Sequence, residues 1–180
     1  MSLKSAARRE PIHHRQIDCH GYRREDGLWD IDARLVDTKT YSFPNTERGE
    51  IKPGEPIHEM WIRLTVDDDL NVKAVDVAMD ATPFGICPDI APAYGVLVGA
   101  KIGPGWSRTV RSLFGGTKGC RHLVELLATV ATVAFQTIAP LRERLAKDAG
   151  KKPPHLDSCH ALATDSPVVK RHYPKFYNGK

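Results

Sequence analysis

The cysteines and histidines of this chain are the residues whose types and spacing could do chemistry. Cys87 lies two residues after Gly85 and directly before Pro88, and Cys120 directly follows Gly119, so each cysteine stands where a glycine-containing stretch leads into a predicted helix. The free amide groups and the positive end of the helix dipole at such a position favour a thiolate, which is both a nucleophile and a metal ligand. We therefore expect chemistry at the starts of two helices.

The first interpretation is a metal site. His58 begins a predicted strand and shares a face with the apolar residues of that strand, so it would meet Cys87 and Cys120 if both helices pack on one face of the sheet. Zinc and iron–sulfur centres take such sulfur and nitrogen donors, and the expected cofactor is zinc, iron or an iron–sulfur cluster. The predicted ligands are His58, Cys87 and Cys120, with a fourth from Cys159, His122 or His160.

Two other interpretations stay open. In a metal-free enzyme of the hydrolase or transferase type, Cys120 would be the nucleophile and His122 or His58 its base, with the preceding glycine loop donating amides to an oxyanion. In an accessory or binding subunit, the cysteines would be core residues. The sequence contains no GxGxxG, GxxxxGK[ST], GxSxG or HExxH motif that would decide whether the protein is an enzyme.

Strands and helices that position these residues are predicted from the spacing of apolar side chains. Alternation of apolar and polar residues predicts two β-hairpins, one over residues 17–35 and a longer one over residues 58–79. Helical patterns cover residues 87–98 and 106–114, and the strongest pattern, within residues 114–142, predicts a long core helix. We expect an α+β fold, in which an antiparallel sheet of two hairpins has helices packed on one face.

The chain is predicted to form one domain. Residues 1–14 are basic and without periodicity, so we expect a flexible arm there and assign no chemistry to His13 or His14. Residues 15–145 would form the α+β domain. Residues 146–180 would form a linker and a C-terminal tail that packs back on the domain, because the tail is rich in aromatic residues.

Composition restricts the compartment and the partners. The 180 residues carry a net charge of +4 and are 41% hydrophobic, which is typical of a soluble protein, and no apolar run approaches the roughly 18 residues of a membrane span. Four scattered cysteines fit a reducing compartment, so we expect a cytoplasmic protein. The basic ends lack the aromatic and glycine pattern of a nucleic-acid-binding module. The partner remains open between a small molecule, another protein and a second copy of the chain.

The middle of the chain resembles a known fold. HEMWIRLTVDDDLNVKAVDVAMDATPFGICPDI and KGCRHLVELLATVA contain a strand hairpin, a cysteine opening one helix and a cysteine opening a long helix. This order is similar to the iron–sulfur cluster scaffold (NifU/IscU-like) fold. The resemblance implies that Cys87 and Cys120 match the second and third cysteines of the scaffold family, whereas Pro56 stands in place of the first.

A second resemblance covers nearly the whole chain. GYRREDGLWDIDARLVDTK, GEPIHEMWIRLT, GGTKGCRHLVELL and CHAL resemble a bacterial family of uncharacterised proteins, the domain-of-unknown-function family 2889. This resemblance implies a soluble bacterial protein and brings no established activity.

Overall fold

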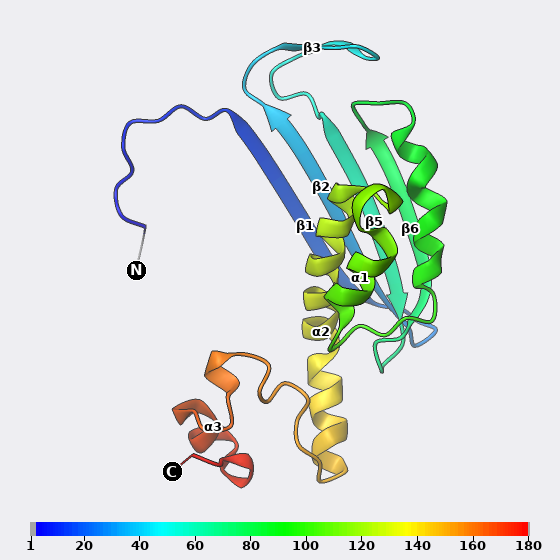
Figure 1. The fold of residues 1–180 in the computed structure, drawn as a ribbon. Coiled ribbons are helices and arrows are strands. Elements are labelled where there is room, and N and C mark those ends of the chain that lie inside the picture. Colours follow the sequence, from blue (N-terminus) through cyan, green and yellow to red (C-terminus); the bar gives the residue numbers. More distant parts are fainter. Residues whose placement is uncertain (1–2, 180) are drawn as a thin grey trace. The chain divides into compact units, whose positions relative to one another are not determined.

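A four-stranded antiparallel sheet is the centre of the fold (Figure 1). The computed structural model describes residues 3–179. The strands lie in the order β1-β2-β5-β6, with β1 at His13–Arg23, β2 at Trp29–Lys39, β5 at His58–Val66 and β6 at Val72–Ala81. The two predicted hairpins are therefore confirmed as β1–β2 and β5–β6. β1 begins two residues inside the range that was expected to be a flexible arm.

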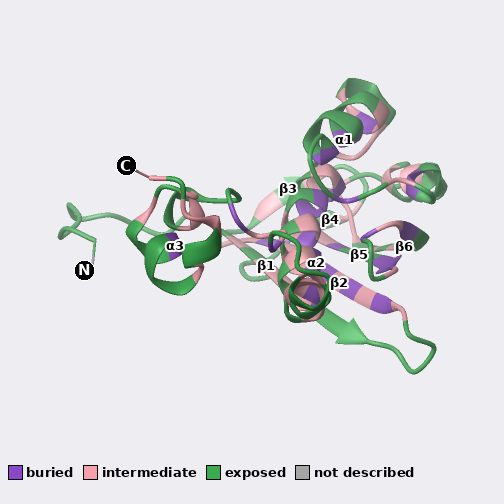
Figure 2. Ribbon diagram, turned by 90° about the horizontal axis from the view of Figure 1, so that it is seen from below, coloured by how far each residue is buried: buried purple, intermediate pink, exposed green. Residues whose placement is uncertain are grey.

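One face of the sheet is buried because apolar residues occupy every second position of the central strands. Trp29, Ile31, Ala33 and Leu35 of β2 are buried, and Leu35 pairs directly with the buried Met60 of β5. Figure 2 shows the alternation of buried and more exposed residues along the strands. On the opposite face, charged side chains of neighbouring strands pair with one another.

A second, two-stranded sheet extends the loop between β2 and β5. Its strands are β3 (Phe43–Asn45) and β4 (Gly49–Ile51). The Arg48 side chain anchors this hairpin by donating hydrogen bonds to the backbone oxygens of Pro56 and Ile57.

Helices cover the buried face of the sheet (Figure 1). The predicted helix from Cys87 is the 3-10 helix η1 (Cys87–Leu97), and its N-cap is Ile86. A 3-10 helix fits this segment because Pro92 lies inside it and cannot donate a backbone hydrogen bond. The predicted helix at Trp106–Phe114 is confirmed as α1 and is followed by the short η2 (Gly116–Lys118).

The long core helix is confirmed as α2 (Arg121–Asp148). Cys120 directly precedes its first residue, and the Cys120 carbonyl accepts the hydrogen bond from the Val124 amide, so Cys120 is the N-cap. By length and composition α2 could cross a membrane, contrary to the expectation from the sequence, although core helices of soluble proteins share this property. We treat α2 as a core helix because four of its apolar side chains in the N-terminal part are fully buried: Leu123, Leu126, Leu127 and Val130.

The chain divides into two compact units within α2, after Val133. The C-terminal unit contains the remainder of α2, η3 (His160–Leu162), α3 (Pro167–His172) and η4 (Pro174–Phe176). Inside this unit, Val169 is buried and the Tyr173 hydroxyl donates to the Glu143 carboxylate at 2.9 Å. The tail thus packs on the C-terminal part of α2, and the domain boundaries expected from the sequence remain predictions.

Candidate metal centre

Three neighbouring strands place one polar row at the end of the buried face. The register pairs Arg15 of β1 with Asp37 of β2, and Asp37 with His58 of β5. Asp37 continues the alternation that buries Leu35, so its carboxylate lies on the core side of the sheet.

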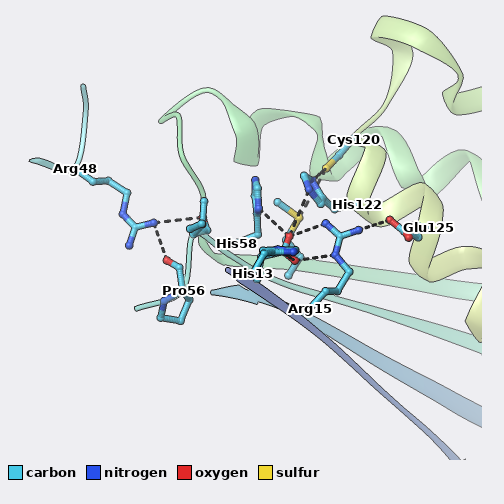
Figure 3. Close-up of polar contacts among 11 residues, drawn as sticks. His13, Arg15, Arg48, Pro56, His58, Cys120, His122 and Glu125 are labelled. Carbon is cyan, nitrogen blue, oxygen red and sulfur yellow. Dashed lines mark hydrogen bonds and ion pairs between the residues drawn. The ribbon is translucent and has the colours of Figure 1, made fainter. Parts of the chain in front are cut away.

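Asp37 is the centre of this row and is only 2% exposed. Arg15 donates from Nε to Oδ1 and from Nη2 to Oδ2, each at 2.7 Å. His13 Nε2 lies 3.0 Å from Oδ1, and His58 Nδ1 lies 3.0 Å from Oδ2 (Figure 3). A buried carboxylate requires such partners because removing its charge from water is costly.

The first turn of α2 places a second histidine, His122, next to this row. His122 Nε2 lies 3.7 Å from Asp37 Oδ2, and the His122 ring lies over the His58 ring with 3.8 Å between the centroids. One ligand atom from each of Asp37, His58 and His122 lies within 4.8 Å of the other two. Among the residues that the structure describes, these three form the one group of three or more His, Cys, Asp or Glu close enough to hold a metal ion. We call them the Asp–His–His triad.

The environment sets the protonation of the triad. Burial by itself raises the pKa of Asp37, but the hydrogen bonds and the charge of Arg15, helped by His58 and His13, lower that pKa below its usual value. Burial lowers the pKa of His58, and the charge of Asp37 only partly opposes it. Burial, followed by the charges of His58 and Arg15, lowers the pKa of His122. At neutral pH the triad therefore consists of one carboxylate and two neutral imidazoles.

Arg15 also links the sheet to α2. Its Nη1 lies 2.5 Å from Glu125 Oε2, one helical turn after His122. The hydrogen bond to Asp37 is the largest cause of a raised pKa for Arg15, with Glu125 contributing further, so Arg15 is a permanent cation between two carboxylates. The Glu125 carboxylate therefore offsets positive charge of Arg15 near the triad.

Cys120 lies beside the triad, at the N-cap of α2. The Cys120 amide donates to the Tyr94 hydroxyl at 3.0 Å, and that hydroxyl donates to the Cys120 carbonyl at 3.2 Å. Burial raises the pKa of Tyr94 to about 12, which keeps its hydroxyl protonated as a donor. The Cys120 Sγ lies 3.8 Å from His122 Nδ1 and 3.8 Å from Met60 Sδ. The thiol therefore approaches Nδ1 of His122, whereas Asp37 approaches Nε2 of the same ring.

The structure brings together three of the residues predicted from the sequence: His58, His122 and Cys120. Cys87 is half-buried at the start of η1 and does not belong to the triad. Cys159 is exposed and belongs to the C-terminal unit. Metal ligation by Cys87, Cys120 and Cys159 thus stays a prediction.

Sequence reasoning missed Asp37 and two of the residues that bind its carboxylate, His13 and Arg15. The signal for Asp37 was present, because it occupies the next core-facing position after Leu35 in an alternating strand. A charged residue at such a position needs partners on neighbouring strands. His13 and Arg15 carried no comparable signal, since β1 is mostly exposed.

Comparison with known proteins identifies a family and no activity. No match to the chain was found among curated proteins or among solved structures. The family described as "Protein of unknown function (DUF2889)" matches residues 13–136, which include the sheet, η1, α1 and all residues of the Asp–His–His triad. Because this match covers more than half of the chain, the protein belongs to that family.

Proposed function

We propose that the Asp–His–His triad binds a divalent transition-metal ion, with zinc as the first candidate. The observation that carries the proposal is the approach of one carboxylate and two neutral imidazoles to within 4.8 Å of one another. Two histidines and one carboxylate form a donor set of zinc and iron(II) sites that keep a coordination position open for water or substrate. Such an ion would supply a polarising centre or an activated water.

The distances to Asp37 Oδ2 support the fit. His58 Nδ1 lies 3.0 Å and His122 Nε2 lies 3.7 Å from this oxygen. Donors that each lie about 2.1 Å from a tetrahedral zinc ion are separated by about 3.4 Å, between the two observed distances. The ion would replace the hydrogen between His58 Nδ1 and Asp37, and His58 would then carry its proton on Nε2.

The remaining contacts of Asp37 would hold the carboxylate in place. Its two oxygens offer about four acceptor positions, which Arg15, His13 and His58 occupy. Only the His58 position must be given up, so Arg15 and His13 would remain as hydrogen-bonding partners of a ligating carboxylate. The Arg15 charge lowers the attraction for a cation, and its pairing with Glu125 offsets part of this cost.

Titration of chelator-stripped protein with zinc and with cobalt(II) tests the proposal. We expect the protein to bind one ion. The affinity for that ion should fall by at least about tenfold in His58→Ala and in His122→Ala. His14→Ala is the matched control, because His14 is an exposed histidine of β1 outside the triad. Circular dichroism would show that each variant is folded. Unchanged affinity in both triad variants would overturn the proposal.

A single zinc or iron(II) ion fits the triad better than an iron–sulfur cluster, because such clusters are held mainly by thiolates and the triad contains none. The cobalt(II) spectrum also tests the predicted thiol ligands, since thiolate coordination adds intense near-ultraviolet absorption. That absorption should fall in Cys120→Ser if Cys120 is a ligand. The cytoplasm remains the expected compartment.

A second candidate function uses Cys120 as a nucleophile. His122 lies between Cys120 Sγ, 3.8 Å from Nδ1, and Asp37 Oδ2, 3.7 Å from Nε2, which is the order of a cysteine, its base and an orienting carboxylate. The two functions exclude each other at one time. A metal on Nε2 leaves the proton of His122 on Nδ1, and a protonated Nδ1 cannot accept the proton of the thiol.

Alkylation of Cys120 by iodoacetamide distinguishes the two functions. A nucleophilic Cys120 should react faster than Cys87 in the metal-free protein, and zinc should slow that reaction. Equal reactivity of the two thiols, with no effect of zinc, would exclude the function of Cys120 as a nucleophile. The metal titration would then decide the first proposal.

A further inference from the structure

A cavity of about 420 Å³ lies between α1 and the first turns of α2, within the N-terminal unit. Three apolar residues of α1 line the cavity: Trp106, Val110 and Phe114. Val124 and Ala128 line the α2 side. These walls suit the apolar body of a small molecule.

The charged groups of the cavity are mainly cationic. Arg111 and Arg121 line it, and within residues 3–179 neither guanidinium is paired with a carboxylate. Glu125 is the acidic residue of the lining, and its carboxylate is bound to Arg15. The cavity therefore offers two unneutralised guanidinium groups, which bind carboxylates and phosphates through paired N–H donors.

Glycines form the third side of the cavity. Gly115, Gly116 and Gly119 line it and have no side chain to fill it. Gly116 has a φ of 64°, which strains other residues, and a Cβ on Gly119 would lie 2.6 Å from the Cβ of Phe114. Backbone conformation at Gly116 and packing against Phe114 at Gly119 thus select glycine on this side of the cavity.

Two side chains link the cavity to the proposed metal centre. Glu125 lines it and bonds to Arg15, which holds Asp37. Glu125 also lies three residues after His122, on the same side of α2 and one turn away. A ligand in the cavity would therefore be connected to the Asp–His–His triad through the side chains of Glu125 and Arg15.

We propose that this cavity binds a small organic anion, a carboxylate or a phosphate monoester with an apolar body, as the substrate class of the neighbouring site. The apolar body packs against Trp106, Val110 and Phe114, and the anionic group pairs with Arg111 and Arg121. As a statement about substrate, the inference rests on the proposed metal function. Binding of the anion itself does not require the metal.

Calorimetric titration with octanoate, octyl phosphate and octanol tests the inference, with and without zinc. Both anions contain the same eight carbons as neutral octanol, so we expect octanol to bind at least about tenfold more weakly, since a charged group paired with arginine contributes more than about 1.4 kcal/mol. Tighter binding of octanoate would identify a carboxylate ligand, and tighter binding of octyl phosphate a phosphate ligand. Equal affinity for octanol and both anions, or no binding of any probe, would overturn the inference.

Three variants complete the test. Arg111→Gln with Arg121→Gln should weaken binding of the anions by at least about tenfold. Ala128→Phe should abolish binding by filling the cavity from an exposed position of α2. Arg108→Gln is the matched control, because Arg108 is exposed on α1 and does not line the cavity. Undiminished anion binding in Ala128→Phe would overturn the inference.

The outcomes separate this inference from the metal proposal. If zinc binds and neither anion does, the cavity inference alone fails. If an anion binds the metal-free protein and zinc does not bind, the metal proposal fails and the cavity remains an anion site without its assigned substrate role.

Discussion

Replacing Asp37 with asparagine tests whether this carboxylate holds the end of the sheet and α2 together. The amide keeps the size of the side chain and loses its charge, and its NH2 group cannot accept the hydrogen bonds that His58, His13 or Arg15 now donate. Arg15 would keep its pairing with Glu125 and lose the buried partner. The variant therefore leaves a cation partly uncompensated.

The size of the effect follows from the burial of the two partners. Breaking a fully buried ion pair by removing one charge costs about 3–5 kcal/mol. The Asp37 side chain is 3% exposed but that of Arg15 is 29% exposed, so water compensates part of the loss. We expect Asp37→Asn to lower the free energy of unfolding by about 2–3 kcal/mol, near or just below this range.

Asp32 provides a matched control on the same strand. It accepts two hydrogen bonds from Arg63 of the neighbouring β5, at 2.6 Å each, in the same cross-strand arrangement. These side chains lie on the open face and are 21% and 47% exposed. Asp32→Asn should therefore cost less than about 1 kcal/mol.

Urea unfolding followed by tryptophan fluorescence measures both variants. All three tryptophans belong to the N-terminal unit, so the signal reports on the unit that contains Asp37. With a slope of about 2 kcal/mol per molar urea, Asp37→Asn should lower the midpoint by about 1–1.5 M. Equal effects of Asp37→Asn and Asp32→Asn would refute the reasoning, because burial would then not decide the strength of these ion pairs.

Three further predictions concern the start of α2 and the triad. Tyr94→Phe removes both hydrogen bonds to Cys120 and should lower the free energy of unfolding by about 1–2 kcal/mol in urea, and an unchanged midpoint would contradict this role of the hydroxyl. Gly119→Ala should cost about 1–3 kcal/mol in the same assay, since the added methyl group would overlap the last residue of α1, and a stabilised variant would show that the loop has room for it. Because burial lowers the pKa values of His58 and His122, the unfolded chain takes up protons that the folded chain does not bind as the pH falls below about 6.5. The melting temperature of the metal-free protein should therefore fall between about pH 7 and pH 5. The fall should be smaller in the variant that combines His58→Gln and His122→Gln, and an equal fall in both proteins would exclude these histidines as its cause.

Local patterns in the sequence predicted most elements of the N-terminal unit. Alternation placed Leu35 and Met60 on the buried face, and helical periodicity placed Leu123 and Leu127 in the core. These patterns are informative because a strand or helix that buries one face must repeat its apolar residues with its own period. Segments with competing signals were predicted less well, as at η1, where a helix was expected but its 3-10 type, which Pro92 favours, was not.

The composition of the candidate site was only partly predictable. His58 was chosen because it begins a strand and shares the apolar face of that strand, and His122 because it lies in the first turn of the long helix. The cysteines were chosen because helix starts favour thiolates, and Asp37 was not among the candidates. Which helix starts meet is decided by packing. Only Cys120 lies beside the triad, where Tyr94 fixes its backbone.

The sequence by itself determined the α+β class, the two hairpins, the long helix and the side of the sheet that is buried. The tertiary structure alone decided that Arg15, Asp37, His58 and His122 meet, because three strand registers and the docking of α2 join residues far apart in the chain. Periodicity states which face a side chain occupies and contains no information about its neighbour on another strand. The register follows from the fit of the whole core, and that fit places a buried carboxylate among one arginine and three histidines.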